Sequence, residues 1–213
     1  AAASEAGAPV PEGTVGAGTG AVAGDLKGGV GTASVRTASG ATVAALAVVN
    51  AAGSVVDPRT GVLYGEYGTG EPLVPPSPAT HEAAGRRLAE LRDVRGGGHF
   101  NTTIAVVATD AALTRAQAQK LAGTAHDGLA RAVRPVHLLT DGDTVFALAT
   151  GGTPLPPEPT AALNGILAAG ADALARAVVK AVRAARGVDG PGGTFPSYGD
   201  LYADRNDHHN DGP

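Results

Sequence analysis

Two short polar triplets carry the side chains best suited to chemistry. Asn101-Thr102-Thr103 and Asp141-Gly142-Asp143 each stand directly before an apolar segment. A hydroxyl beside a suitable base can act as a nucleophile, and a pair of carboxylates can orient an ammonium group or a hydroxyl. The 213 residues include no cysteine, no Gly-x-Ser-x-Gly motif and no His-Glu-x-x-His motif. Hydroxyl nucleophiles with unconventional bases therefore remain as the main enzymatic option.

Each triplet also has a purely structural explanation. Threonine is enriched in strands for steric reasons, so residues 101–103 can be no more than a strand edge, and the residues alone favour that explanation. Aspartate commonly caps its own backbone in turns, so residues 141–143 are by themselves more typical of a turn. Asn101-Thr102-Thr103 also satisfies the glycosylation sequon, which we interpret as accidental because no secretory signal accompanies it.

The glycine-rich stretch VGAGTGA at 15–21 matches a loose dinucleotide-binding pattern. No strand is predicted before it and no amphipathic helix after it, so nucleotide binding is not expected, and a P-loop is excluded because Gly-Lys-Ser/Thr is missing. Two explanations stay open. The glycines mark a bend where side chains do not fit, or they let backbone N–H groups approach a substrate. His208 and His209, in the polar tail, predict no more than weak adventitious metal binding.

Composition limits the fold and the partners. Apolar residues make up 43% of the chain and aromatic residues only 3%, with no Trp or Met. The core must therefore be built from Ala, Val, Leu and Ile with closely approaching backbones. A net charge of −4 gives no electrostatic footprint for nucleic acid or an anionic membrane. We expect a soluble, cytoplasmic protein, and the opening AAASEA without an initiator Met suggests a fragment or a processed product.

Hydrophobic patterns predict strands first, and then alternating strands and helices. The expected elements are a hairpin of 32–37 and 42–50 around Ser39-Gly40, a helix at 81–92, a strand at 102–110 covered on both faces, a helix at about 114–132, a strand at 144–150 and a long helix from about 160. Thr114 and Gln117 predict a capping box for the second helix. The last ten residues, 204–213, are polar and expected to be disordered. This order predicts a layered α+β fold with sheets covered by helices.

Three blocks carry a resemblance to a known family. GAGTGAVAGDLKGGVGTASV at 16–35, NTTIAVVATDAALTRAQAQKLA at 101–122 and TDGDTVFALATG at 140–151 resemble, in order and spacing, the DmpA-type peptidases. That family includes L-aminopeptidase/D-esterase, β-aminopeptidases and nylon-oligomer hydrolases. The resemblance implies a single αββα sandwich domain over 1–203 of the N-terminal-nucleophile type. It also implies a precursor that cleaves itself at Asn101-Thr102 into 1–101 and 102–213.

The resemblance also implies a role for each site residue. Thr102 is the nucleophile, and its freed α-amine, with an ordinary pKa of about 7.7–8.0, is a well-matched general base. Asn50 stabilises the oxyanion of the tetrahedral intermediate. Asp141 and Asp143 hold the amine of Thr102 and a substrate ammonium, while Lys27 favours the alkoxide. The expected protein is a homo-oligomer of cleaved subunit pairs that hydrolyses small peptides or oligoamides without a metal or an organic cofactor.

The sequence departs from the family in one respect. Family precursors carry a further N-terminal region that contributes strands and a site tyrosine, and this sequence does not contain it, so we expect an incomplete sheet. Two alternatives remain open. One is an acyltransferase of the ornithine acetyltransferase type, which shares the threonine nucleophile and a related fold. The other is an uncleaved, inactive fragment that serves only as a scaffold.

Overall fold

A four-stranded sheet forms the centre of the molecule. The computed structural model describes residues 9–95, 101–190 and 192–203. The strands, in their order across the sheet, are β3 (Gly29–Arg36), β4 (Thr42–Val49), β5 (Ile104–Ala111) and β6 (Thr144–Thr153). β4 is antiparallel to both β3 and β5, whereas β5 and β6 are parallel. The parallel pair needs a crossover connection, which α2 (Arg115–Ala132) supplies.

The predicted hairpin and capping box are both confirmed. β3 and β4 pair in one continuous antiparallel register, and Gly40 adopts a positive φ of 87° in the turn between them. At the start of α2, Thr114 Oγ1 accepts a hydrogen bond from the Gln117 backbone N–H, and Gln117 Oε1 accepts one from the Thr114 N–H. These local signals are strong because each requires specific residue types at fixed spacing.

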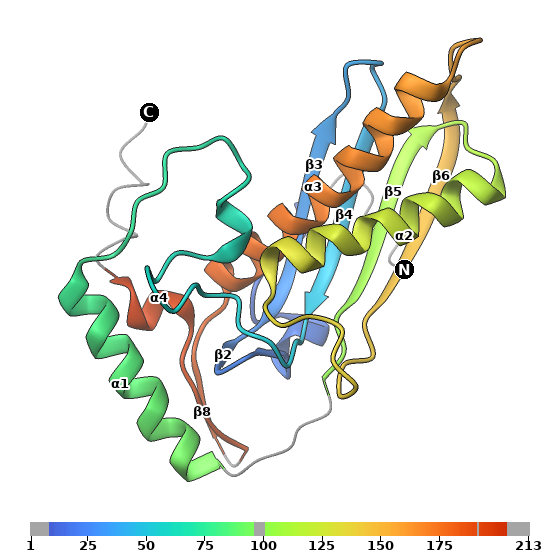
Figure 1. Ribbon diagram of the computed structural model, residues 1–213. Helices are drawn as coiled ribbons and strands as arrows, with labels where there is room; N and C mark the ends of the chain where they lie inside the picture. Colours follow the sequence, from blue (N-terminus) through green and yellow to red (C-terminus); the bar gives the residue numbers. More distant parts are fainter. Residues whose placement is uncertain (1–8, 96–100, 191, 204–213) are drawn as a thin grey trace.

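Two helices cover one face of the sheet. α2 and α3 (Thr160–Ala184) lie across β3, β4, β5 and β6 on the same side (Figure 1). A Cβ added to Gly31 would lie 2.1 Å from the Ala177 carbonyl oxygen, and one added to Gly128 would lie 2.3 Å from the Ala171 carbonyl oxygen. Such contacts confirm the expectation of closely approaching backbones. α3 is long and apolar enough to cross a membrane by length and composition, but it packs here as a core helix.

The other face of the sheet is open in the described part of the chain. Four large apolar side chains on it are 38–58% exposed: Leu46, Ile104, Phe146 and Leu148. Their neighbours Ala105 and Val107 are buried under the helices. The prediction of a β5 strand covered on both faces is therefore wrong for the described residues. Of the four layers in the predicted αββα sandwich, these residues form one helix layer and one four-stranded sheet.

The remaining elements surround the lower end of the sheet in Figure 1. They are η2 (Gly16–Thr19), β1 (Val22–Ala23), β2 (Leu26–Lys27), η3 (Tyr64–Glu66), α1 (Pro78–Arg95), β7 (Val188–Gly190), β8 (Gly193–Phe195) and α4 (Tyr198–Leu201). α1, predicted at 81–92, begins three residues earlier and packs against α4 to one side of the sheet. The tail 204–213 lies outside the described residues.

Candidate active site

The β4–β5 register, extended two residues beyond its last pair, would bring Asn50 opposite Thr102. The β4–β5 ladder ends with the antiparallel pair Val48↔Ile104. Side chains two residues apart in a strand point to the same face. Two residues beyond Val48 and Ile104, the same face is reached by Asn50 and Thr102. Both residues lie at the end of the sheet, on the face that the helices leave open. The predicted nucleophile and the predicted oxyanion donor therefore belong to neighbouring strand positions. We call this line of positions across the strand ends, with Asn50 and Thr102 in it, the row.

The Asp-Gly-Asp turn extends this row on the other side of Thr102. Asn101 and Asp141 form an isolated parallel bridge, in which the Gly142 N–H donates to the Asn101 carbonyl at 2.9 Å. A Cβ added to Gly142 would lie 2.7 Å from Thr102 Oγ1, so a side chain at this position would displace the hydroxyl. The glycine between the two aspartates therefore leaves room for the Thr102 hydroxyl in its present rotamer.

Thr102 contacts the peptide bond that is predicted to break. Its Oγ1 donates a hydrogen bond to the Asn101 carbonyl oxygen at 2.7 Å. Asn101 is buried, and Thr102 is half-buried. The hydroxyl therefore lies beside the carbonyl group that it would attack during self-cleavage. The neighbouring Thr103 points the other way, and its buried Oγ1 has no hydrogen-bond partner among the described residues.

Asn50 is oriented by β1. The Val22 backbone N–H donates to Asn50 Oδ1 at 3.0 Å. Because a backbone N–H can only donate, the contacting amide atom must be the oxygen. Nδ2 is then the group that remains available to donate. A fixed amide donor in the same row as Thr102 has the chemistry that oxyanion stabilisation needs.

Asp141 connects two loops through its carboxylate. Oδ1 accepts from the Ala52 N–H at 2.9 Å, and Oδ2 accepts from the Leu138 N–H at 3.3 Å. The segment that follows Asn50 is thereby attached to the turn beside Thr102. The structural explanation for this aspartate is supported by these contacts, while its predicted role toward the Thr102 amine stays a prediction.

Asp143 has different partners. Oδ1 accepts from the Thr103 N–H at 2.9 Å, and Oδ2 contacts His137 Nδ1 at 2.8 Å. Its side chain is only 3% exposed. His137 Nε2 in turn lies 3.2 Å from His126 Nδ1. Sequence reasoning missed both histidines, because a turn and a helix bring them together and no regular spacing marks them.

Lys27 is a buried cation beside the row. It is 2% exposed, and its Nζ donates to the carbonyls of Gly18, at 3.1 Å, and Ala21. Burial lowers the pKa of this amine. Lys27 pairs with Val22, the residue that orients Asn50, so it belongs to the same end of the sheet. Its contacts stabilise the glycine-rich turn, and the predicted role at the alkoxide stays a prediction.

The first of the two explanations for the glycine-rich stretch holds at Gly18, and at Gly28 just beyond it, whereas a Cβ on Gly16 or Gly20 would meet nothing within 4 Å. A Cβ on Gly18 would lie 2.4 Å from the Gly13 carbonyl oxygen, and one on Gly28 would lie 2.0 Å from the Val49 carbonyl oxygen. Side chains do not fit at these positions. Gly28 also continues the β3–β4 register to a position opposite Asn50, because the last pair of that ladder is Gly29↔Val49.

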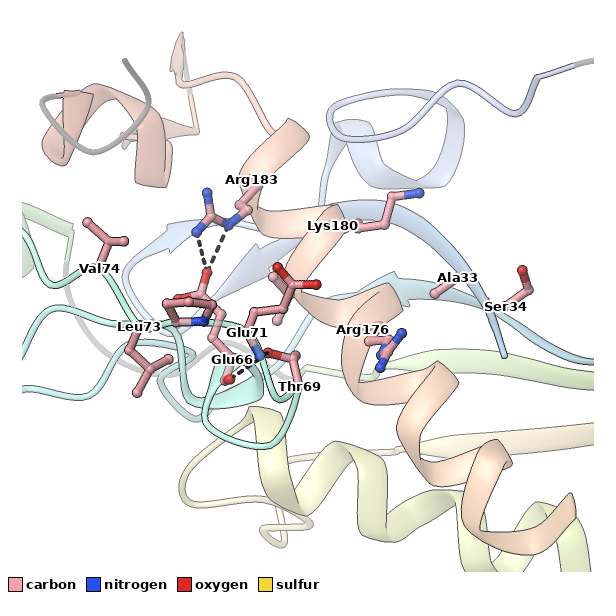
Figure 2. Close-up of a pocket in the computed structure, with 12 residues that line it drawn as sticks. Ala33, Ser34, Glu66, Thr69, Glu71, Leu73, Val74, Arg176, Lys180 and Arg183 are labelled. Atoms are coloured by element: carbon pink, nitrogen blue, oxygen red, sulfur yellow. Dashed lines mark hydrogen bonds and ion pairs between the residues drawn. The ribbon is translucent and has the colours of Figure 1, made fainter. Parts of the chain in front are cut away.

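Two pockets lie away from this row. One of about 600 Å³ opens between α3 and the segment after η3, where Arg183 Nε donates to Glu66 Oε1 at 2.8 Å (Figure 2). Another of about 710 Å³ lies beside α1 and includes His81 and Tyr202. Neither pocket is lined by the predicted site residues. Within the described residues, no group of three or more metal-ligating side chains is present.

Sequence comparisons point to one family. Residues 1–195 match the family described as Peptidase family S58. An uncharacterized aminopeptidase of Mycobacterium tuberculosis is 49% identical over 208 residues, with 92% of this chain and 58% of that protein covered. A 6-aminohexanoate-oligomer endohydrolase of a Kocuria species is 30% identical over 175 residues, with 77% and 46% covered. This chain thus spans about half the length of these relatives.

Solved structures give the same result for the fold. A β-aminopeptidase of a Burkholderia species superimposes with a TM-score of 0.64 and 27% identity, covering 96% of this chain and 56% of that one. The L-aminopeptidase D-Ala-esterase/amidase of Ochrobactrum anthropi, described as a variant of the Ntn hydrolase fold, gives 0.62 and 25%, covering 94% and 53%. The predicted fold class is confirmed.

Proposed function

Because the chain belongs to Peptidase family S58, we propose that it is part of an amide-bond hydrolase with Thr102 as nucleophile. In the precursor, Thr102 Oγ1 attacks the carbonyl carbon of Asn101. The bond to the Thr102 nitrogen breaks as an ester forms and the hydroxyl proton passes to that nitrogen. Water then hydrolyses the ester, which leaves a carboxylate on Asn101 and a free α-amine on Thr102.

The same hydroxyl then acts on substrate. The α-amine takes the proton of Thr102 Oγ1 as the hydroxyl attacks an amide carbonyl, and Asn50 Nδ2 donates to the developing oxyanion. An acyl-enzyme forms, the amine product leaves, and water releases the acid. Positioned proton transfer typically contributes about 10²- to 10⁴-fold, and one oxyanion donor about 10²- to 10³-fold. No step requires a metal or an organic cofactor.

One observation carries this proposal. Thr102 lies two residues before β5, where the extended β4–β5 register points to Asn50, and its Oγ1 donates a hydrogen bond of 2.7 Å to the carbonyl oxygen of Asn101. If Thr102 only formed a strand edge, neither an asparagine at the neighbouring position nor a glycine beside its hydroxyl would be expected. The lack of space for a Cβ at Gly142, which would lie 2.7 Å from Thr102 Oγ1, supports the same conclusion.

The names of the relatives support a proposal for the substrate class, and the open sheet face supports one for the assembly. One relative is named an aminopeptidase and another an oligoamide hydrolase, so we propose peptides with free N-termini or oligoamides as substrates.

The apolar face around Ile104 and Phe146 needs a cover in water, because four large side chains on it are exposed. We propose that further strands of the longer protein cover this face, and that cleaved pairs assemble into homo-oligomers.

The mass of the purified chain tests the nucleophile. Wild type should yield two fragments that separate between Asn101 and Thr102, whereas Thr102→Ala should remain at 20.8 kDa. Thr103→Ala is the matched control, since it removes a neighbouring hydroxyl on the opposite face and should cleave normally. Processing of Thr102→Ala at the wild-type rate would refute the assignment. Aminoacyl p-nitroanilides and 6-aminohexanoate oligomers then separate the two substrate classes.

A further inference from the structure

A chain of polar contacts connects the start of β5 with α2. The buried carboxylate of Asp143 accepts the Thr103 N–H through Oδ1 at 2.9 Å and contacts His137 Nδ1 through Oδ2 at 2.8 Å. Beyond it, His137 Nε2 lies 3.2 Å from His126 Nδ1, and the two rings meet edge to face at 65°. The first member of this chain is the peptide group directly after the proposed nucleophile.

The contacts define the tautomer of His137. An ionised carboxylate has no hydrogen to give, so the contact with Asp143 places a proton on His137 Nδ1. In the neutral imidazole, Nε2 is then an acceptor for an N–H on His126 Nδ1. Burial, and next the neighbouring His137, lower the pKa of His126, although Asp143 and Asp127 oppose that shift. A neutral His126 can therefore donate to His137, which donates to Asp143.

The backbone at His137 has an unusual conformation, while its side chain is 38% exposed. Its φ is +56°, and it is the one non-glycine residue with positive φ among those the structure describes. For most residues with a Cβ this left-handed conformation is unfavourable, although histidine adopts it more often than most. Such conformations persist where the surrounding contacts determine them, and they gather at functional sites. The side-chain contacts with Asp143 and His126, and the two hydrogen bonds between Leu138 and Asp141, all act on this turn.

We propose that His137 is a positioning residue for the reaction at Thr102. It holds Asp143 so that Oδ1 receives the Thr103 N–H, and this hydrogen bond fixes the main chain that carries the Thr102 hydroxyl. His126 keeps His137 in the tautomer that donates to Asp143. His137 acts through Asp143 and not on the reacting atoms. The effect of His137 on the reaction rests on the proposed function. Its effect on the main chain at Thr103 does not.

Two variants separate the hydrogen bond from the backbone conformation. His137→Gly adopts positive φ without strain but lacks the donor. His137→Asn also tolerates positive φ, and its Nδ2 can donate from nearly the position of the imidazole Nδ1. His81→Gln is the control histidine variant, because His81 contacts Pro58 and Tyr202 beside α1. Thermal unfolding of each variant checks that it is folded.

Amide hydrogen exchange measures the positioning directly. The Thr103 amide should exchange at least about tenfold faster in His137→Gly than in wild type, and His137→Asn should restore most of the protection. Self-cleavage and kcat should fall about 10- to 100-fold in His137→Gly, with KM little changed, because small misplacements of a reacting group have effects of this size. His137→Asn should recover most of the rate, and His81→Gln should match wild type.

Three results would overturn the proposal. Protection of the Thr103 amide in His137→Gly would show that His137 does not hold the main chain. Equal losses in the Gly and Asn variants would show that the donor is not the cause. Histidine NMR spectra that place the His137 proton on Nε2 would remove its basis. An intact wild-type chain would refute the proposed function alone, since the exchange and NMR measurements still decide the role of His137.

Discussion

Two turns lie at the end of the sheet where β4 ends and β5 begins. A side-chain donor stabilises one of them, and side-chain acceptors stabilise the other. On the glycine-rich side, Lys27 donates to two main-chain carbonyls. On the aspartate side, Asp141 and Asp143 accept main-chain N–H groups. The Gly18 and Ala21 carbonyls also accept backbone N–H groups, from Ala21 and Gly28 respectively. A carbonyl has two lone pairs and an N–H only one hydrogen, so loss of a partner costs more on the aspartate side.

Asp143→Ala should produce the largest loss of stability in this comparison. The Thr103 N–H is buried and loses its acceptor, and His137 loses its partner, so the unfolding free energy should fall by about 2–3 kcal/mol. Asp143→Asn, which can keep an oxygen toward Thr103, should lose less. Urea denaturation of both variants measures the difference. If both lose the same amount, the negative charge and not the accepted N–H is what stabilises this turn.

Asp141→Ala should have a smaller effect. It leaves the N–H groups of Ala52 and Leu138 without an acceptor, but Leu138 is 39% exposed and water can replace the carboxylate there. We expect a loss of about 1–2 kcal/mol, measured in the same denaturation experiment. Asp141→Asn is the matched variant. Unchanged stability in Asp141→Ala, together with lost cleavage in both variants, would instead assign this residue to the chemistry.

Strand patterns in the sequence locate the positions of this site, whereas the roles of its residues came from the family resemblance and stay predictions. Thr102, Asn50 and Asp143 stand at strand ends, where the chain enters or leaves the sheet, and strand patterns are visible in sequence. Once the strands pair, their register brings these positions into one row. The same signals located the hairpin and the capping box at Thr114.

The parts that could not be predicted depend on loop conformation. His137 reaches Asp143 only because its backbone adopts a left-handed φ, which no local pattern indicates. Lys27 contacts Gly18 and Ala21 because the glycine-rich turn bends around it, and its role at the alkoxide stays a prediction. The prediction that β5 is covered on both faces was wrong for the described residues, because a continuous apolar run does not show how many layers pack on a strand.

The pH dependence of stability distinguishes Lys27 from the aspartates. Burial lowers the pKa of Lys27 in the folded state, whereas in the unfolded chain it is the ordinary value of about 10.4. Between these two values the unfolded chain binds more protons, so the unfolding free energy of wild type should rise with pH. Lys27→Met lacks this contribution. The stability of wild type relative to Lys27→Met should therefore increase as the pH approaches about 10.4.

Denaturation of both proteins at several alkaline pH values measures that difference. Lys180→Met is the matched lysine variant, because Lys180 is exposed and paired with Glu12, away from the glycine-rich turn. At neutral pH, Lys27→Met should lose less stability than Asp143→Ala, since the carbonyls keep their backbone donors. A difference that shrinks with rising pH would mean that the charged amine is favoured by folding, which would contradict its burial.

Thr103→Val should have the smallest effect, and it tests the two adjacent threonines against each other. Thr103 is 1% exposed, and its Oγ1 has no partner among the described residues, so its burial opposes folding. Valine has nearly the same shape without the hydroxyl. Stability should stay the same or rise by up to about 1 kcal/mol, and self-cleavage should be unchanged. A clear loss of stability would show that Thr103 Oγ1 has a hydrogen-bond partner in solution. The two threonine hydroxyls would then differ only in the face of the strand on which they lie.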